Sequence, residues 1–183
     1  MKSFTDEVKD EFKKKRDEAK HLFEQKRDEF KAEFAARQAA AKAEFETRKA
    51  ELQDRLQNFR DDTKKRITES LFDRLNALNE RATSHFSNVL DKLDNVLERI
   101  ENRMEKAKVH GADITAVEIA INNAKTAIAA ARDVVEAQAG KLYDFEVTSE
   151  NGVRDAISAV KDELKADLRE LKGIISEAKD AVH

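Results

Sequence analysis

The chain has 183 residues, a formal net charge of −3, and no proline, cysteine or tryptophan. The lack of cysteine excludes disulfides and thiolate chemistry, and a 40% share of charged residues with abundant Ala, Glu, Lys, Leu and Arg favours long helices. Residues 1–66 carry 19 Lys and Arg against 16 Asp and Glu, and residues 67–183 carry 16 against 22, an imbalance too mild for a protein that neutralises many phosphates.

An eleven-residue repeat dominates the first 109 residues. Residues 32–53 read as two copies of one unit, AEFAARQAAAK and AEFETRKAELQ. The third place of nine successive units, counted from residue 10, is always large and apolar: Phe12, Phe23, Phe34, Phe45, Leu56, Ile67, Leu78, Val89 and Ile100. Eleven residues make three helical turns, so these side chains share one helix face. With no glycine before Gly111, the pattern predicts one very long helix over about 3–109.

This helix is predicted to have two parts. Up to residue 66 the apolar stripe is narrow, and Glu–Lys and Glu–Arg pairs four residues apart support an exposed helix. Beyond residue 66 the stripe widens, as expected for a helix packed in a bundle. We therefore predict a domain of residues 1–66, an extended charged helix, and a domain of residues 67–183 whose core does not use the extension.

Two shorter helices are predicted after Gly111, which fits a left-handed residue at a helix C-terminus. Thr115 with Glu118 forms a capping-box pattern that starts a helix over about 115–145. Thr148 or Ser149 is the expected cap of the next helix, over about 150–182. Short loops favour antiparallel neighbours, so the predicted fold is all-α, with the C-terminal part of the long helix and these two helices forming an antiparallel three-helix bundle.

No pattern in the chain predicts catalysis or a cofactor. His21, His85, His110 and His183 are the only histidines, and no two have the spacing of a metal-binding pair on a helix. There is no glycine-rich phosphate loop or nucleophile motif. We predict a non-enzyme without catalytic, cofactor or metal residues and without a small-molecule substrate.

Basic clusters and apolar runs give little sign of nucleic-acid binding or membrane insertion. The clusters KKKR at 13–16 and KKR at 64–66 adjoin acidic residues that cancel their field, which disfavours a nucleic-acid partner. No signal peptide and no run of some 18 apolar residues is present. The expected location is cytoplasmic by default, or exported if an upstream signal was removed.

The phenylalanine stripe of the long helix is the predicted functional feature. Its leading interpretation is an association seam that inserts into a second copy or a helical protein partner. A lipid-facing stripe and a bare, charge-stabilised spacer are the alternatives. The predicted seam residues are Phe12, Phe23, Phe30, Phe34, Phe45, Leu52 and Leu56. We therefore expect a structural or interaction protein, with a peripheral lipid-surface protein as the runner-up.

Two resemblances follow from these residues. The eleven-residue units of residues 10–64 resemble those of exchangeable apolipoproteins, which implies lipid binding. The stretch from RLQNFRDDTKKRITES to KLYDFEVTSE is similar in texture to uncharacterised helical proteins of candidate-phylum bacteria, a resemblance that covers roughly residues 54–183. The second resemblance implies a helical fold and no activity.

Overall fold

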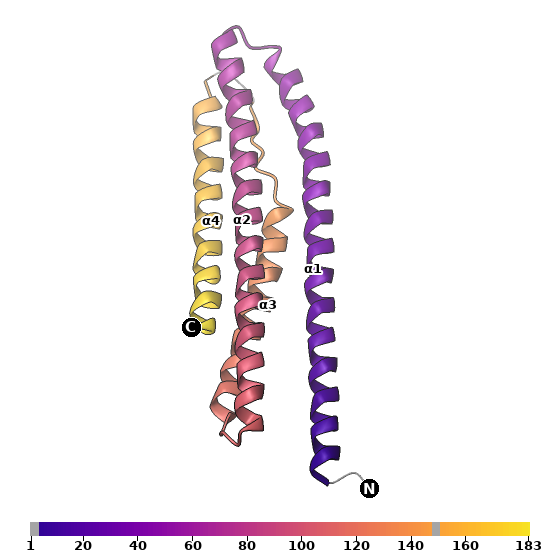
Figure 1. Ribbon diagram of the computed structural model, residues 1–183. Helices are drawn as coiled ribbons and strands as arrows, with labels where there is room; N and C mark the ends of the chain where they lie inside the picture. Colours follow the sequence, from indigo (N-terminus) through magenta and orange to yellow (C-terminus); the bar gives the residue numbers. More distant parts are fainter. Residues whose placement is uncertain (1–3, 148–150) are drawn as a thin grey trace. The chain divides into compact units, whose positions relative to one another are not determined.

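The computed structural model describes residues 4–147 and 151–183, without the side chains of residues 4–12, 15, 16 and 19. All regular secondary structure in these residues is α-helical. Figure 1 shows the four helices, which are α1 (Phe4–Leu56), α2 (Asp62–Val109), α3 (Thr115–Ala139) and α4 (Val153–Val182). The predicted all-α class is confirmed.

The predicted unbroken helix over about 3–109 is wrong, because the chain turns between Leu56 and Asp62. The Asp61 carboxylate accepts hydrogen bonds from the backbone N–H groups of Thr63 and Lys64, at 2.8 and 3.1 Å, and so caps the start of α2. Phe59, in the turn itself, is buried in the core. The burial of this ring and of the apolar stripe behind it outweighs the few helical hydrogen bonds lost at the turn.

After this turn α2 runs back along the second part of α1. The side chain of Gln38 donates to the Ser84 hydroxyl at 2.9 Å, and Lys49 pairs with Asp73 at 2.9 Å. Residue numbers thus rise along α1 as they fall along α2, which makes the two segments antiparallel. The segment of α1 from residue 37 onward is therefore packed within the chain.

The core lies where α1, α2, α4 and the segment before α4 meet. Its buried residues are Leu52, Leu56, Phe59, Phe72, Leu75, Tyr143, Phe145, Val147, Val153, Ile157 and Leu164. Helix α2 also packs against α3, and α3 packs against α4. The prediction that the core of residues 67–183 does not use the preceding residues is wrong, because three of these side chains precede residue 60.

The turn after α2 follows the sequence pattern in part. Gly111 has φ +83°, which confirms the predicted left-handed residue. The predicted capping by Thr115 is wrong, because the Asp113 carboxylate instead accepts from the backbone N–H and the hydroxyl of Thr115, at 3.0 and 2.8 Å. These hydrogen bonds, the backbone one first, lower the pKa of Asp113.

The predicted helices over about 115–145 and 150–182 differ from the structure at their inner ends. Helix α3 ends at Ala139, and residues 141–147 form an extended strap that runs alongside α2 toward the start of α4 (Figure 1). The strap buries Tyr143, Phe145 and Val147, which a continued helix would distribute around its circumference. Thr148 and Ser149, the predicted caps, lie outside the described residues, and α4 begins at Val153.

The chain divides into two compact units, residues 1–36 and residues 37–183. The predicted boundary at residue 66 falls inside the second unit, near the start of α2. The second unit contains the core described above, the strap, and the cavity and surface described below.

Candidate functional site

Three of the seven predicted seam residues belong to the second unit, where Leu52 and Leu56 lie in the core and Phe45 packs against it. Leu52 and Leu56 are each 1% exposed. The ring of Phe45 stacks on that of Phe72, with centroids 5.1 Å apart and planes at 10°. Phe145 meets the ring of Phe72 edge-on at 5.9 Å. This part of the stripe therefore already has its packing partners within the chain.

The other four predicted seam residues belong to the unit of residues 1–36. The side chain of Phe12 lies outside the described residues. The rings of Phe30 and Phe34, one helical turn apart, stack with centroids 5.7 Å apart, and both are buried. Phe23 is half-buried, and its neighbour Leu22 is 55% exposed.

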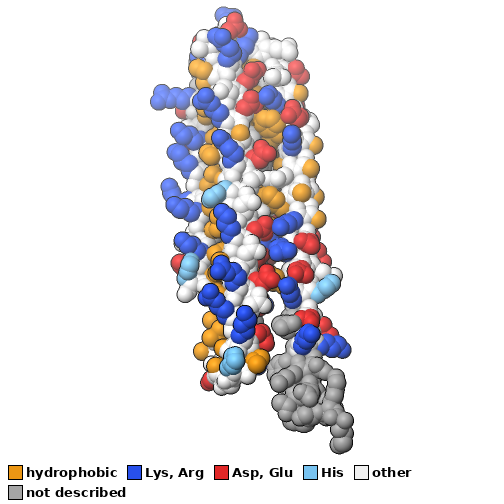
Figure 2. Space-filling view, viewed as in Figure 1, with side chains coloured by type: hydrophobic (Ala, Val, Ile, Leu, Met, Phe, Trp, Pro, Cys, Tyr) orange, Lys and Arg blue, Asp and Glu red, His pale blue; other side chains and the backbone are white. Residues whose placement is uncertain are grey.

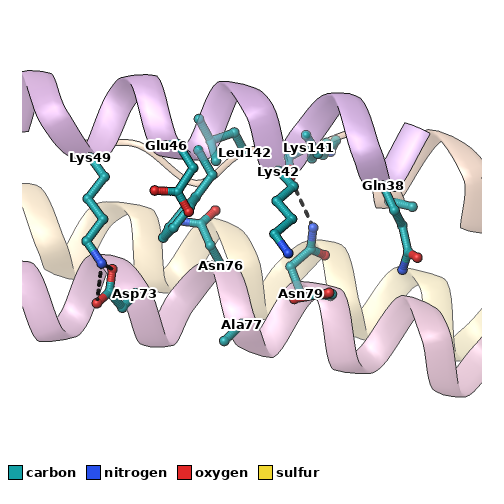
Figure 3. Close-up of a pocket in the computed structure, with 14 residues that line it drawn as sticks. Gln38, Lys42, Glu46, Lys49, Asp73, Asn76, Ala77, Asn79, Lys141 and Leu142 are labelled. Carbon is teal, nitrogen blue, oxygen red and sulfur yellow. Dashed lines mark hydrogen bonds and ion pairs between the residues drawn. The ribbon is translucent and has the colours of Figure 1, made fainter. Parts of the chain in front are cut away.

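A cavity of about 300 Å³ lies in the second unit between α1, α2 and the end of α3 (Figure 3). Apolar side chains, among them Phe45 and Leu142, and the ion pair between Lys49 and Asp73 contribute to its wall. Two amides from α2 complete it. Asn79 donates to the backbone carbonyls of Gln138 and Lys141 at 3.1 Å, and Asn76 exchanges hydrogen bonds of 2.9 and 3.0 Å with the backbone of Tyr143.

These amides were not singled out from the sequence, although buried Asn residues within an apolar helix stripe are a signal of such contacts. Their hydrogen-bonding groups are used to hold the end of α3 and the strap against α2. The cavity is therefore a junction within the fold whose principal polar groups are already engaged.

Tyr143 extends this network toward α4. Its side chain is 2% exposed, and its hydroxyl donates to the Asp167 carboxylate at 2.5 Å and accepts from the Gln138 amide at 2.6 Å. Burial, followed by the hydrogen bond to Asp167, raises the pKa of Tyr143 far above its usual value. Burial alone would raise the pKa of Asp167, but hydrogen bonds from Lys141 and Tyr143 outweigh it and lower that pKa.

Replacing Tyr143 by phenylalanine should lower the free energy of unfolding by roughly 1–2 kcal/mol near neutral pH, because Asp167 and Gln138 each lose a partner. The raised pKa of Tyr143 means that its contribution is present below the pKa of the unfolded chain, about 10, and is lost as the pH rises further. Urea unfolding at neutral and alkaline pH measures both effects.

The control for this prediction is spectroscopic. Tyr143 is the only tyrosine and the chain has no tryptophan, so ultraviolet absorbance follows the ionisation of this phenol alone. An apparent pKa near 10 in the folded protein would contradict the assignment. Tyr143→Phe should also lack the component of alkaline destabilisation that this phenol contributes.

A buried ion pair joins α2 to α3. The Arg132 guanidinium contacts the Asp94 carboxylate, and it also lies 3.2 Å from Asp91. The side chains of Arg132 and Asp94 are only 8% and 2% exposed. Such a pair fixes the register of two helices, because any slip would leave charges buried and unpaired.

Within the described residues, no group of three or more His, Asp or Glu side chains is arranged to hold a metal ion. In the same part of the chain no helix combines the length and the apolar character that crossing a membrane requires.

The outer face of α2 carries cations that have no ion pair within the described residues. They are Arg66, Arg74, Lys92, Arg99, Arg103 and Lys106, all of them exposed. Three acidic side chains of α2 pair with other helices, since Asp73 pairs with α1 while Asp94 and Glu101 pair with α3. These three carboxylates are thus engaged inside the fold, while the six cations share another side of the helix.

Large apolar side chains accompany these cations. Ile67, Leu78 and Val96 are 52%, 45% and 39% exposed, and their spacings of 11 and 18 residues place them on one line along α2. Leu71, near the start of this line, is half-buried. Figure 2 shows one column of Lys and Arg side chains over α2 and a second column of Lys and Arg side chains over α4. Hydrophobic side chains lie between these two columns.

The second column belongs to α4, whose exposed cations Arg154, Lys161, Arg169, Lys172 and Lys179 have no ion pair in the described residues either. We call the apolar line of α2, with the cations of α2 and α4 on its two sides, the basic face. Counts of charge along the chain do not reveal the basic face, because cations and carboxylates alternate in the sequence and separate only around the axis of each helix.

Comparisons of the chain with protein-family models, with curated proteins and with solved structures found no match. The described residues define an all-helical protein of four helices.

Proposed function

We propose that this is a non-enzymatic interaction protein that binds a helical partner along the outer face of α2. The observation that carries the proposal is the exposure of Ile67 and Leu78. These residues occupy the third place of the eleven-residue repeat, as do Leu56 of the core and Phe45, which packs against the core. The repeat therefore leaves the core at the turn and continues on the surface, where an apolar line with helical periodicity suits another helix.

The phenylalanine stripe predicts self-association or binding to a helical partner. A symmetric pairing of two basic faces would place unpaired cations of one copy against those of the other, which is unfavourable. A different helical protein avoids this repulsion. In the stripe of residues 1–36, Phe30 and Phe34 are already buried, and Phe12 and Phe23 remain a second proposed seam for self-association.

Site-directed photo-cross-linking tests the α2 proposal in cells that make the protein. A benzophenone amino acid in place of Ser70, which lies one helical turn after Ile67 on the outer face of α2, should give a discrete protein adduct on irradiation. The same amino acid in place of Glu170, an exposed residue of α4 among its acidic side chains, is the matched control. Equal labelling at both positions, or none at either, would contradict the proposal.

The runner-up, a peripheral lipid-surface protein, predicts another outcome of the same experiment. Adducts at position 70 would then have the small mass increase of a lipid instead of that of a protein. The exposed apolar side chains beside cations are the observation that keeps this alternative open.

A further inference from the structure

We infer that the partner of the basic face is an acidic amphipathic helix, an inference that rests on the proposed function and adds the chemistry of its ligand. Eleven exposed cations of α2 and α4 have no ion pair within the described residues, and they stand on both sides of one apolar line. A helix with an apolar stripe and carboxylates on its two flanks complements both features at once.

The N-terminal end of α2 carries a hollow that suits the side chains of such a helix. A hollow of about 400 Å³ is lined by the apolar side chains of Ile67 and Leu71, by the guanidinium groups of Arg66 and Arg74, and by two hydroxyl-bearing residues. An apolar side chain of the ligand fits over Ile67 and Leu71. A carboxylate one helical turn away on the same ligand lies within reach of an arginine, which binds carboxylates with two parallel hydrogen bonds.

The surface shape of the basic face favours a helical ligand over a lipid bilayer. Ile67, Leu78 and Val96 are 52%, 45% and 39% exposed, and the exposed cations beside them have longer side chains. The apolar line therefore lies lower than its charged borders. A narrow ridge such as a helix reaches a line of this kind, but a flat membrane surface contacts the cations first.

Nucleic acid fits the basic face less well than a helix does. His85, 18 residues after Ile67 and so on this line, is the one exposed aromatic ring of α2, whereas proteins that bind single strands stack successive bases on several rings. The cations of α2 follow a straight helix of 48 residues, about 70 Å long, while the phosphates of a duplex wind around its axis.

Binding of synthetic helices to the full chain tests the inference. The probe is a fluorescent amphipathic peptide with leucine along one face and glutamate on both flanks, and its isomer carries lysine at every glutamate position. Fluorescence anisotropy should show saturable binding of the glutamate peptide, weakened by added salt, and at least tenfold weaker binding of the lysine peptide.

Variants locate the site on the protein. Arg74→Gln combined with Lys92→Gln should weaken binding of the glutamate peptide by roughly threefold to tenfold, because each exposed ion pair contributes at most about a factor of five. Lys26→Gln combined with Lys42→Gln removes two exposed cations of α1 and should leave the affinity unchanged. Leu78→Gln should weaken binding of both peptides by a similar factor, and circular dichroism confirms that each variant stays folded.

Each further outcome overturns the inference in a distinguishable way. Equal affinity for the two peptides removes the acidic preference but leaves a helix-binding groove, so the proposed function survives. Binding of vesicles of anionic phospholipid or of a DNA duplex, without binding of the glutamate peptide, assigns the cations to that other ligand. Unchanged affinity in the Arg74 and Lys92 double variant places the peptide elsewhere on the chain.

Discussion

Replacing Leu52 or Leu56 by alanine should lower the free energy of unfolding by about 2–5 kcal/mol at each site. Both side chains are 1% exposed and belong to the core that α1 shares with α2, the strap and α4. Neighbouring sites in one core couple, so the double variant is expected to differ from the sum of the two single ones. Urea unfolding followed by circular dichroism measures the effect.

Gln53 supplies the control, because it lies on α1 between the two leucines and is exposed. Gln53→Ala should change the free energy of unfolding by less than about 0.5 kcal/mol. Wild-type stability of Leu52→Ala and Leu56→Ala would contradict the packing of α1 against α2 and favour the extended helix that the repeat predicts.

Truncation tests the same core on a larger scale. A chain of residues 37–183 retains every side chain of this core and should unfold cooperatively. A chain of residues 67–183 lacks Leu52, Leu56 and Phe59 and exposes Phe72 to solvent, so its melting temperature should be far lower. Similar melting of the two truncated chains would restore the boundary at residue 66.

Replacing Asp94 by asparagine should cost about 3 kcal/mol of stability, the second large effect expected here. The neutral amide leaves the Arg132 guanidinium buried with a weaker partner, and Asp91 at 3.2 Å compensates in part. Thermal unfolding of the full chain measures the loss. Its control is Asp162→Asn, which removes an exposed pair with Lys165 and should cost less than about 1 kcal/mol.

A double variant separates the charge from the packing at this site. Asp94→Leu combined with Arg132→Met removes both buried charges together and should be more stable than Asp94→Asn alone. If the single and double variants are equally destabilised, lost packing and not the unpaired guanidinium is the cause.

The eleven-residue repeat does not predict the turn at residues 57–61. The third place of the repeat is apolar on both sides of this turn, at Leu56 and at Ile67, so its periodicity predicts an uninterrupted helix. The adjacent residues Asp61 and Asp62 precede a helix and are a local signal of an N-terminal cap. This signal is weak by itself. The free energy gained when the apolar stripe of α1 after residue 37 is buried against α2 comes from contacts between residues far apart in the sequence, so a local sequence pattern does not reveal it.

The pattern of apolar residues also does not predict which side of α2 is buried. Apolar side chains cover a wide arc of this helix, and the predicted stripe includes Ile67 and Leu78, which are exposed. The buried side includes Thr68 and Thr83, both 0% exposed, whose hydroxyls donate to backbone carbonyls one turn earlier at 2.7 and 3.0 Å. These internal hydrogen bonds allow polar residues on the packed side of the helix.

The sequence by itself determined the helical class, the one-sided stripe of α1 and the turn at Gly111, because all three depend on spacing and backbone preference within a few turns. The tertiary structure alone decided that α1 ends at Leu56, that residues 141–147 are extended, and that one arc of α2 faces outward. The physical reason is that burial is shared among segments distant in sequence. The arrangement with the most favourable total burial and ion pairing prevails over the preference of any single helix.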